Sequence, residues 1–294
     1  MASAQSTRTV KQVGEPFAER IVSVKGRGKA LQLDLFAGER LVDGLARAFA
    51  QAGFSGGVVD VGGVALDHFS YVMPALSKDR VNAAFYSDVY RPHGVIVLES
   101  GRMSFGRRDD APFFHCHALW PEEDGLTHGG HILPDDVRLA TDQTLYAYGF
   151  DGGIFEANPD RETNFKLFGP VPVPQSLQAQ SDLEPCYLMR LRPNQDLHGA
   201  LEQFCAQHDL PDMRILGGVG STIGGRFEDG SALDPFATEV YIREGTIRRE
   251  AQHSYQAHID VGYVDYTGQI ARGSIVRGDS PVLMTFELLL APLA

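Results

Sequence analysis

The sequence repeats itself at a nearly constant spacing, and this repeat constrains the fold more than any other feature. Related positions in the first part of the chain lie 156 residues apart (197 − 41), and later ones lie 143 residues apart (258 − 115). The related pairs are Leu41 with Leu197, Leu45 with Leu201, His115 with His258, Gly125 with Gly268 and Gly130 with Gly273. Loop deletions easily absorb a change of about a dozen residues. The sequence therefore predicts a tandem duplication.

The same short order of strands and helices is predicted for both copies. In the first copy, alternating apolar residues predict strands over 20–24 and 31–35, with a glycine-rich hairpin turn over 25–29. An amphipathic helix is expected over 39–50, followed by an apolar strand over 58–61. The second copy predicts a strand over 187–191, a helix over 196–205 and a strand over 213–216. This order predicts an α+β fold with two tandem domains, each a largely antiparallel sheet with flanking helices.

The chain divides into four expected parts. Residues 1–17 are polar and lack an apolar core segment, so we expect a disordered tail rather than a signal peptide. The first domain is expected over 18–168 and the second over 184–294. The proline content of residues 169–183 predicts an extended linker between them.

Three histidines form the most informative motif. His115 and His117 are two positions apart in an apolar stretch, so in a strand both side chains project to one face and Cys116 to the other. His131 follows after a turn-forming segment, and a hairpin would bring it back to the first two. Three imidazoles with an open fourth position form the ligand set of a catalytic zinc or similar divalent ion. We therefore expect His115, His117 and His131 to bind a divalent metal, with Zn²⁺ as the expected ion.

The second copy lacks most of this motif. His258 corresponds to His115, but Asp260 replaces His117 and Ser274 replaces His131. A serine hydroxyl is a poor ligand for a borderline cation. We therefore expect an intact site in the first domain and a degraded one in the second.

Composition limits the possible functions. No apolar run approaches the roughly 18 residues that a membrane span needs. The formal net charge of −12 opposes nonspecific attraction to the phosphates of nucleic acids. The three cysteines are widely spaced and odd in number, which favours a reducing cytoplasm over a disulfide framework. We expect a cytoplasmic protein with a small-molecule ligand.

A catalytic metal also needs an acid or base and a means of holding the substrate. Glu122 follows the histidine strand directly and is the expected general acid or base, although a solvated acidic turn is the alternative interpretation. Arg107 and Arg108 precede that strand by a loop, and their guanidinium groups suit a carboxylate substrate. These residues indicate hydrolase or lyase chemistry on a small anionic molecule without selecting one reaction.

The segment from His115 through Gly129-Gly130-His131-Ile132-Leu133 resembles the signature of the plants-and-prokaryotes-conserved (PPC) domain. Together, the two copies extend this resemblance from about residue 18 to near the end of the chain. The resemblance implies small α+β domains with antiparallel sheets, a metal held by the three histidines, and assembly as a homo-oligomer. A trimer is implied by the family, and a dimer is equally compatible with the sequence. Plant members carry an AT-hook and bind A·T-rich DNA, so bacterial relatives are often labelled DNA-binding.

This chain departs from the plant pattern. An AT-hook needs Arg-Gly-Arg-Pro, whereas Lys25-Gly26-Arg27-Gly28 lacks the proline. The chain therefore resembles the bacterial type without an AT-hook. Three hypotheses remain: a metal-dependent enzyme, which we favour, a DNA-binding or regulatory protein, and a metal- or metabolite-binding module without catalysis.

Overall fold

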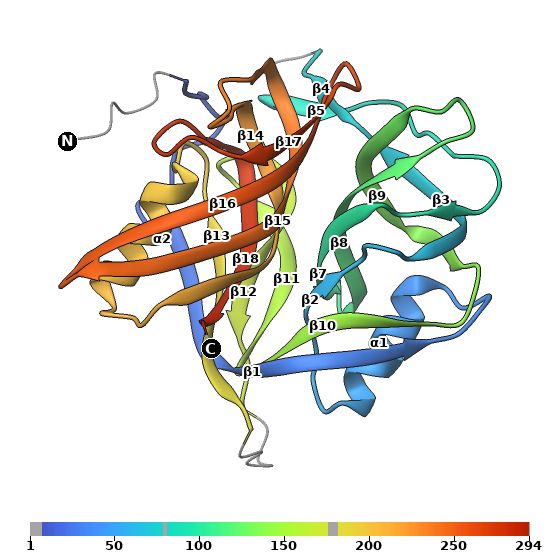
Figure 1. The fold of residues 1–294 in the computed structure, drawn as a ribbon, viewed down its shortest axis with the longest axis horizontal. Coiled ribbons are helices and arrows are strands. Elements are labelled where there is room, and N and C mark those ends of the chain that lie inside the picture. The colour runs from blue at the N-terminus through green and yellow to red at the C-terminus, as the bar shows by residue number, and fades with distance from the viewer. Residues whose placement is uncertain (1–7, 79–80, 176–181, 294) are drawn as a thin grey trace.

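One continuous sheet of 16 strands forms most of the protein (Figure 1). The computed structural model describes residues 8–78, 81–175 and 182–293. The prediction of an α+β fold with flanking helices is wrong. Among these described residues, each half has a single 11-residue helix, and the remaining regular structure is strand. The antiparallel character of the sheet is as expected, apart from one short parallel contact of residues 106–107 with residues 155–156. The fold is predominantly β.

The first half contains α1 and the strands β1 to β12. Their bounds are β1 Ile21–Leu35, α1 Leu41–Gln51, β2 Gly57–Asp60, β3 Ala65–Val72, β4 Pro74–Leu76, β5 Ala84–Tyr86, β6 Ile96–Val97, β7 Ser100–Arg108, β8 Ala111–Pro121, β9 Thr127–Leu139, β10 Gln143–Asp151, β11 Gly153–Asp160 and β12 Phe165–Pro172. Strands β4 and β5 form a separate hairpin outside the large sheet.

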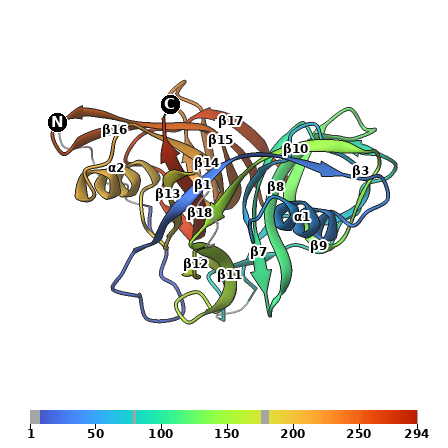
Figure 2. The same ribbon diagram turned by 90° about the horizontal axis from the view of Figure 1, so that it is seen from below.

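The second half contains α2 and the strands β13 to β18. Their bounds are β13 Glu184–Leu191, α2 Leu197–Gln207, β14 Met213–Arg226, β15 Ala232–Ala251, β16 Ser254–Asp265, β17 Ile270–Ser274 and β18 Val282–Pro292. The two predicted helices are confirmed, and α1 and α2 lie in different lobes (Figure 2).

Strand β1 joins the two halves. Its first part pairs with β13 and its second part with β10, and both neighbours flank Arg27 and Gly28. The predicted hairpin turn over 25–29 is therefore wrong. A Cβ atom on Gly26 would lie 2.2 Å from the carbonyl oxygen of Asp151, and one on Gly28 would lie 2.3 Å from that of Gly149. These glycines allow close approach of neighbouring backbones rather than a turn.

Each half has its own hydrophobic core. Leu41, Leu45 and Phe49 of α1 pack into the first core, and Leu197, Leu201 and Phe204 of α2 pack into the second. A smaller cluster includes side chains from both halves, such as Phe155 and Leu289. Because this cluster is buried, it holds the two halves against each other.

The pairing pattern of the first half recurs in the second at the predicted spacing. In the first half β1 pairs with β10, with Leu31 opposite Ala147; in the second half β13 pairs with β18, with Tyr187 opposite Leu290. These partners are shifted by 156 and 143 residues, respectively (187 − 31 and 290 − 147). In each half, therefore, the strand that precedes the helix pairs with the strand that contains the related partner.

The predicted tail and linker differ from the structure where they are described. Residues 1–7 and 176–181 lie outside the described residues. Within the expected tail, the Val10 amide donates to Asn194 Oδ1 and the Gln12 amide group donates to the Leu283 carbonyl. Val10 and Gln12 therefore contact the second half, while the amides of Gly14 and Phe17 donate to Glu162 of the first half. Residues 169–172 of the expected linker belong to β12, which pairs with β11.

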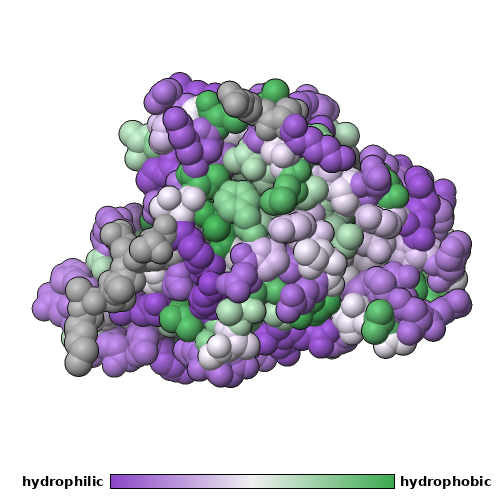
Figure 3. Space-filling model, turned by 90° about the horizontal axis from the view of Figure 1, so that it is seen from above, coloured by the Kyte–Doolittle hydropathy of each residue, from purple (hydrophilic) through white to green (hydrophobic). Residues whose placement is uncertain are grey.

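The remaining expectations concern the surface and the cysteines. No helix among the described residues is both long and apolar enough to cross a membrane. Cys116, Cys186 and Cys205 are buried free thiols. Figure 3 shows a hydrophobic patch bordered by hydrophilic residues on one face of the molecule.

Candidate metal centre

Strands β8 and β9 bring the three predicted ligands together. His115 and His117 share one face of β8, while Cys116 projects into the core on the other face. The β8–β9 hairpin places His131 directly opposite His117, as predicted. One possible ligand atom from each of the three histidines lies within 4.8 Å of the others. The hairpin thus builds a compact imidazole cluster.

The spacing of the ring nitrogens suits a metal ion. His115 Nε2 lies 3.0 Å from His117 Nε2, which lies 3.3 Å from His131 Nδ1. Tetrahedral ligands with metal–nitrogen bonds of about 2.0–2.1 Å lie about 3.3 Å apart. His117 is buried and His131 nearly so, which limits competition from bulk water. The cluster therefore fits a divalent ion of the zinc type.

The outer ring nitrogens of two histidines are held by acceptors from the second half of the chain. His115 Nδ1 lies 2.6 Å from Glu287 Oε2 on β18, and His117 Nδ1 lies 2.9 Å from the Val240 carbonyl oxygen on β15. Hydrogen bonds donated by these Nδ1 atoms leave the Nε2 lone pairs directed into the cluster. Acceptors of this kind fix the tautomer and ring orientation of metal-binding histidines.

A second carboxylate from the second half lies within the cluster. Glu239 Oε2 on β15 lies 2.9 Å from His117 Nε2. Glu239 and Glu287 are both buried. Uncompensated buried charges are costly, and a divalent cation would balance two carboxylates while the imidazoles stay neutral. Glu239 is also the nearest candidate for a fourth ligand.

The surroundings of His115 and His131 shift the pKa values of these two histidines in opposite directions. Burial alone lowers the pKa of His115, but the adjacent Glu287 and Glu239 carboxylates outweigh burial and raise it. Burial and the neighbouring His115 and His117 hold the pKa of His131 well below its usual value. His131 therefore stays neutral and keeps a lone pair for a cation.

Glu287 is positioned by a chain of buried hydrogen bonds. Its Oε1 accepts from the Thr285 hydroxyl at 3.0 Å, and Thr285 Oγ1 accepts from Arg190 Nε at 3.1 Å. Arg190 in turn donates to Asp160 Oδ2 at 2.7 Å. This chain connects the carboxylate beside His115 to Asp160 of the first half. Both halves therefore fix the centre.

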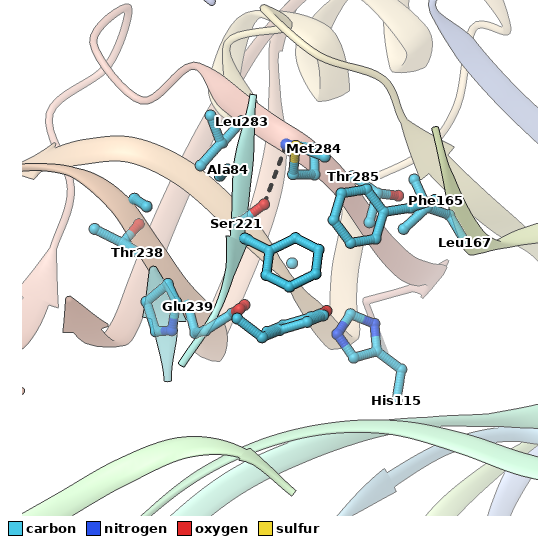
Figure 4. A pocket seen from close by; sticks show the side chains of 15 residues that line it. Ala84, His115, Phe165, Leu167, Ser221, Thr238, Glu239, Leu283, Met284 and Thr285 are labelled. Atoms are coloured by element: carbon cyan, nitrogen blue, oxygen red, sulfur yellow. Dashed lines mark hydrogen bonds between the residues drawn. The ribbon is translucent and has the colours of Figure 1, made fainter. Parts of the chain in front are cut away.

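Two cavities border the centre. The larger is an open cleft of about 860 Å³ that His115, His131 and Glu287 border. The smaller, of about 40 Å³, has His115 and Glu239 along one side and Leu283 and Met284 along the other (Figure 4). The larger cleft is within the range of small-molecule sites.

Tyr86, from the β4–β5 hairpin, borders both cavities. Its ring centroid lies 5.3 Å from that of His131. Burial, with the negative charges of Glu239 and Glu287, raises the pKa of Tyr86. Its hydroxyl therefore remains protonated and can donate a hydrogen bond.

The expected catalytic residues lie in three different places. Arg108 borders the larger cleft. The guanidinium of Arg107 instead pairs with Glu156, with Nε 2.6 Å from Oε2. Glu122 Oε1 accepts from Trp120 Nε1 at 2.9 Å. Trp120 packs in the core on the β8 face opposite the histidines, so the structure brings only Arg108 to the cleft with the ligands.

Sequence reasoning missed Glu239 and Glu287. Each is the single charged residue of a five-residue strand segment, Ala237–Tyr241 and Phe286–Leu290, respectively. A charged residue at such a position signals a buried partner or a functional site. No spacing rule links these residues to histidines that are more than 100 positions away, so the sequence could flag them but not pair them.

The corresponding place in the second half has different contacts. Ser274 lies opposite Asp260, as His131 lies opposite His117, so the predicted correspondence holds for strand register. Ser274 Oγ lies 3.3 Å from His258 Nε2, and Asp260 forms an ion pair with Arg243 at 3.2 Å. The aspartate charge is thus already compensated by an arginine.

Comparisons with known proteins give structural similarities only. No family model and no curated protein matches the sequence. A PPC protein from Pyrococcus horikoshii has 18% identity and a TM-score of 0.40, over 51% of this chain and 97% of its own. A metal-containing protein from Archaeoglobus fulgidus has 21% identity and a TM-score of 0.39, over 50% and 97%. A "putative DNA-binding protein" from Ralstonia eutropha has 13% identity and a TM-score of 0.35, over 48% and 90%.

Proposed function

We propose that this protein binds a divalent metal, with Zn²⁺ as the expected ion, through His115, His117 and His131. The observation that carries the proposal is the group of possible ligand atoms around His117 Nε2. One nitrogen each of His115 and His131 and a carboxylate oxygen of Glu239 lie within 3.3 Å of this atom. Such a set places several lone pairs close together in a buried site. A cation relieves the repulsion between them and compensates the carboxylates.

We further propose that the metal supports enzymatic chemistry of the hydrolase or lyase type on a small anionic molecule. When bound, a divalent ion supplies Lewis-acid polarisation or lowers the pKa of water. Glu239 supplies a carboxylate oxygen beside His117 Nε2, and Tyr86 can donate a hydrogen bond to a ligand oxygen. Arg108 contributes positive charge to the same cleft. A binding module without catalysis is the alternative for the same site.

Elemental analysis of the purified protein tests the metal. We expect about one zinc per chain in the wild type and none in His117→Ala. His258→Ala is the matched control, because it removes the related histidine of the second half and should retain the metal. A wild type without stoichiometric metal would contradict the proposal.

Turnover needs a separate test. The metal-loaded protein and His117→Ala are incubated with a metabolite extract and compared by mass spectrometry. We expect an anionic compound to be consumed only by the metal-loaded wild type. If the metal is present and no compound is consumed, the protein is a binding module and the enzymatic proposal fails.

DNA binding is the second candidate function, because the similar Ralstonia protein is named as a "putative DNA-binding protein". The net charge of −12 opposes it. Lys25 to Gly28, the nearest match to an AT-hook, lies within β1 and pairs with β13. Salt-dependent binding to A·T-rich duplex DNA would support this function, and no binding at about 50 mM salt would exclude it.

We also propose that the chain is a tandem PPC protein of the type without an AT-hook, with domains over 18–168 and 184–294. The recurrence of the pairing pattern at the same offsets supports the duplication. Strands β17 and β6 are the ends of the described sheet, and exposed edges favour pairing with another copy. A homo-oligomer, trimer or dimer, is therefore proposed, and sedimentation measures it.

A further inference from the structure

The larger cleft beside the centre has an aromatic wall. Phe85 is about half exposed, and Phe113 and Phe165 are partly exposed where they border the cleft. Phe85 packs on Phe165 with centroids 6.2 Å apart, and Phe113 packs on Phe168 with centroids 5.7 Å apart. Aromatic side chains that remain open to a cleft beside polar groups are typical of small-molecule sites.

The aromatic wall reaches the metal centre. Phe165 and His115 both border both cavities, and Figure 4 shows the two side chains lining the smaller one. Tyr86 contacts Phe165 edge to face, with centroids 6.1 Å apart, and also contacts His131. A flat ring resting on this wall would therefore direct one end toward the histidines.

A cation borders the cleft at the β7–β8 turn. Asp109 and Asp110 both have positive φ angles, of 51° and 62°, as a two-residue hairpin turn of type I′ requires. This turn places Arg108 against the ring of Phe113, with the guanidinium carbon 5.3 Å from the centroid. Arg108 is thus held next to the aromatic wall by a cation–π contact.

The charge of Arg108 is only weakly compensated. Its Nε lies 3.8 Å from Asp109 Oδ2, which is longer than a hydrogen bond. Both oxygens of the Asp109 carboxylate accept from Lys166 Nζ at 2.9 Å. The planar fork of Arg108 can therefore receive a carboxylate from the cleft.

The histidine cluster already has two carboxylates beside it. Glu287 Oε2 lies 2.6 Å from His115 Nδ1, and Glu239 Oε2 lies 2.9 Å from His117 Nε2. An anionic group would therefore be bound more favourably by Arg108 than at the centre, where a neutral carbonyl or hydroxyl oxygen is the better match.

We propose that the cleft binds an aromatic carboxylate, with the carboxylate on Arg108, the ring on the phenylalanine wall and a neutral oxygen toward the histidine cluster. This inference rests on the proposed function, since it names the substrate class of that site. The simplest ligand of this class is a single ring with polar groups at opposite ends.

Calorimetric titration of the metal-loaded protein tests this proposal with 4-hydroxybenzoate as the probe. Two matched compounds serve as controls: 4-hydroxybenzamide, which lacks the negative charge, and 4-hydroxycyclohexanecarboxylate, which lacks the flat ring. We expect 4-hydroxybenzoate to bind at least tenfold more tightly than either one. Equal binding of the acid and either control would overturn the proposal.

Two variants test whether Arg108 binds the carboxylate of the ligand. Arg108→Gln should weaken binding of 4-hydroxybenzoate by about tenfold or more and leave binding of the amide unchanged. Arg248→Gln, an exposed arginine of the second half, removes the same charge and should have no effect. Equal affinity of wild type and Arg108→Gln for the acid would place the anion elsewhere and overturn the proposal.

Measuring the metal content of the same protein distinguishes a failure of this inference from a failure of the proposed function. A protein with stoichiometric metal that does not bind 4-hydroxybenzoate overturns the inference and leaves the metal centre intact. A protein that binds the acid through Arg108 but carries no metal supports this ligand site and contradicts the metal-dependent function.

Discussion

His115 and Glu287 are joined by a 2.6 Å contact between Nδ1 and Oε2, although 172 positions separate them in the sequence. His115 comes from the half with the complete histidine motif, and Glu287 comes from the half in which that motif is degraded. The second half therefore supplies groups that orient histidines of the first half.

Replacing Glu287 by glutamine tests this contribution. The amide oxygen can still accept from His115, but the negative charge is lost. We expect metal affinity, measured by competition with a chelator, to fall by about 10- to 100-fold. Glu99→Gln is the control, because Glu99 lies at the surface and pairs with Arg272. Unchanged affinity in Glu287→Gln would show that the carboxylate has no role in metal binding.

Asp160 is expected to stabilise the junction between the halves. Its Oδ2 accepts from Arg190 at 2.7 Å and from Arg192 at 2.8 Å. Asp160→Asn leaves two buried guanidinium groups without an anionic partner, so we expect a loss of about 3 kcal/mol or more in unfolding free energy. Denaturant titration measures it, and the exposed Asp234→Asn should change stability by less than about 0.5 kcal/mol.

The Asp160 contribution should depend on pH. Burial alone raises the pKa of Asp160, but the charges of Arg190 and Arg192 and the hydrogen bond from Thr163 lower it overall. A lowered pKa in the folded state stabilises the protein above the unfolded value of about 3.9, and the effect is lost as pH falls through the folded pKa. The stability difference between wild type and Asp160→Asn should be constant above about pH 5 and shrink in acid. A difference that grows in acid would contradict this linkage.

Gly130 is expected to set the position of His131. A Cβ atom at Gly130 would lie 2.6 Å from the carbonyl oxygen of Val72, and Val72 pairs with His131. Gly130→Ala should therefore force β3 and β9 apart, destabilise the protein by about 1–3 kcal/mol and weaken metal binding. At Gly169 the nearest atom would be 3.8 Å away, so Gly169→Ala is the control and should bind metal normally. Thermal unfolding with and without zinc measures both effects, and normal metal affinity in Gly130→Ala would refute the positioning role.

The sequence predicted what depends on local spacing. The two helices and the β8–β9 hairpin follow from periodicity within about 20 residues, so the histidine cluster could be predicted from the sequence alone. Strand β1 was mispredicted because Gly26 and Gly28 are also typical of turns. Their strand role depends on β10, which lies more than 100 residues away.

The prediction of the fold class is wrong for a related physical reason. Long strands such as β14 and β15 contain glycines and charged residues whose suitability for a strand depends on neighbours in the sheet. Local patterns therefore did not reveal that the two halves share one sheet. For the same reason, the sequence alone does not show that Glu239 and Glu287 lie beside the histidines.

Anomalous diffraction at the zinc edge tests the central claim most directly. Crystals of the protein purified with zinc should show one strong peak about 2.0–2.1 Å from the nearest ring nitrogens of His115, His117 and His131. Glu239 should adjoin the same peak. A zinc peak only at the surface pair His128 and Asp124, whose Nε2 and Oδ2 atoms lie 2.9 Å apart, or no peak at all, would contradict a metal centre built from both halves of the chain.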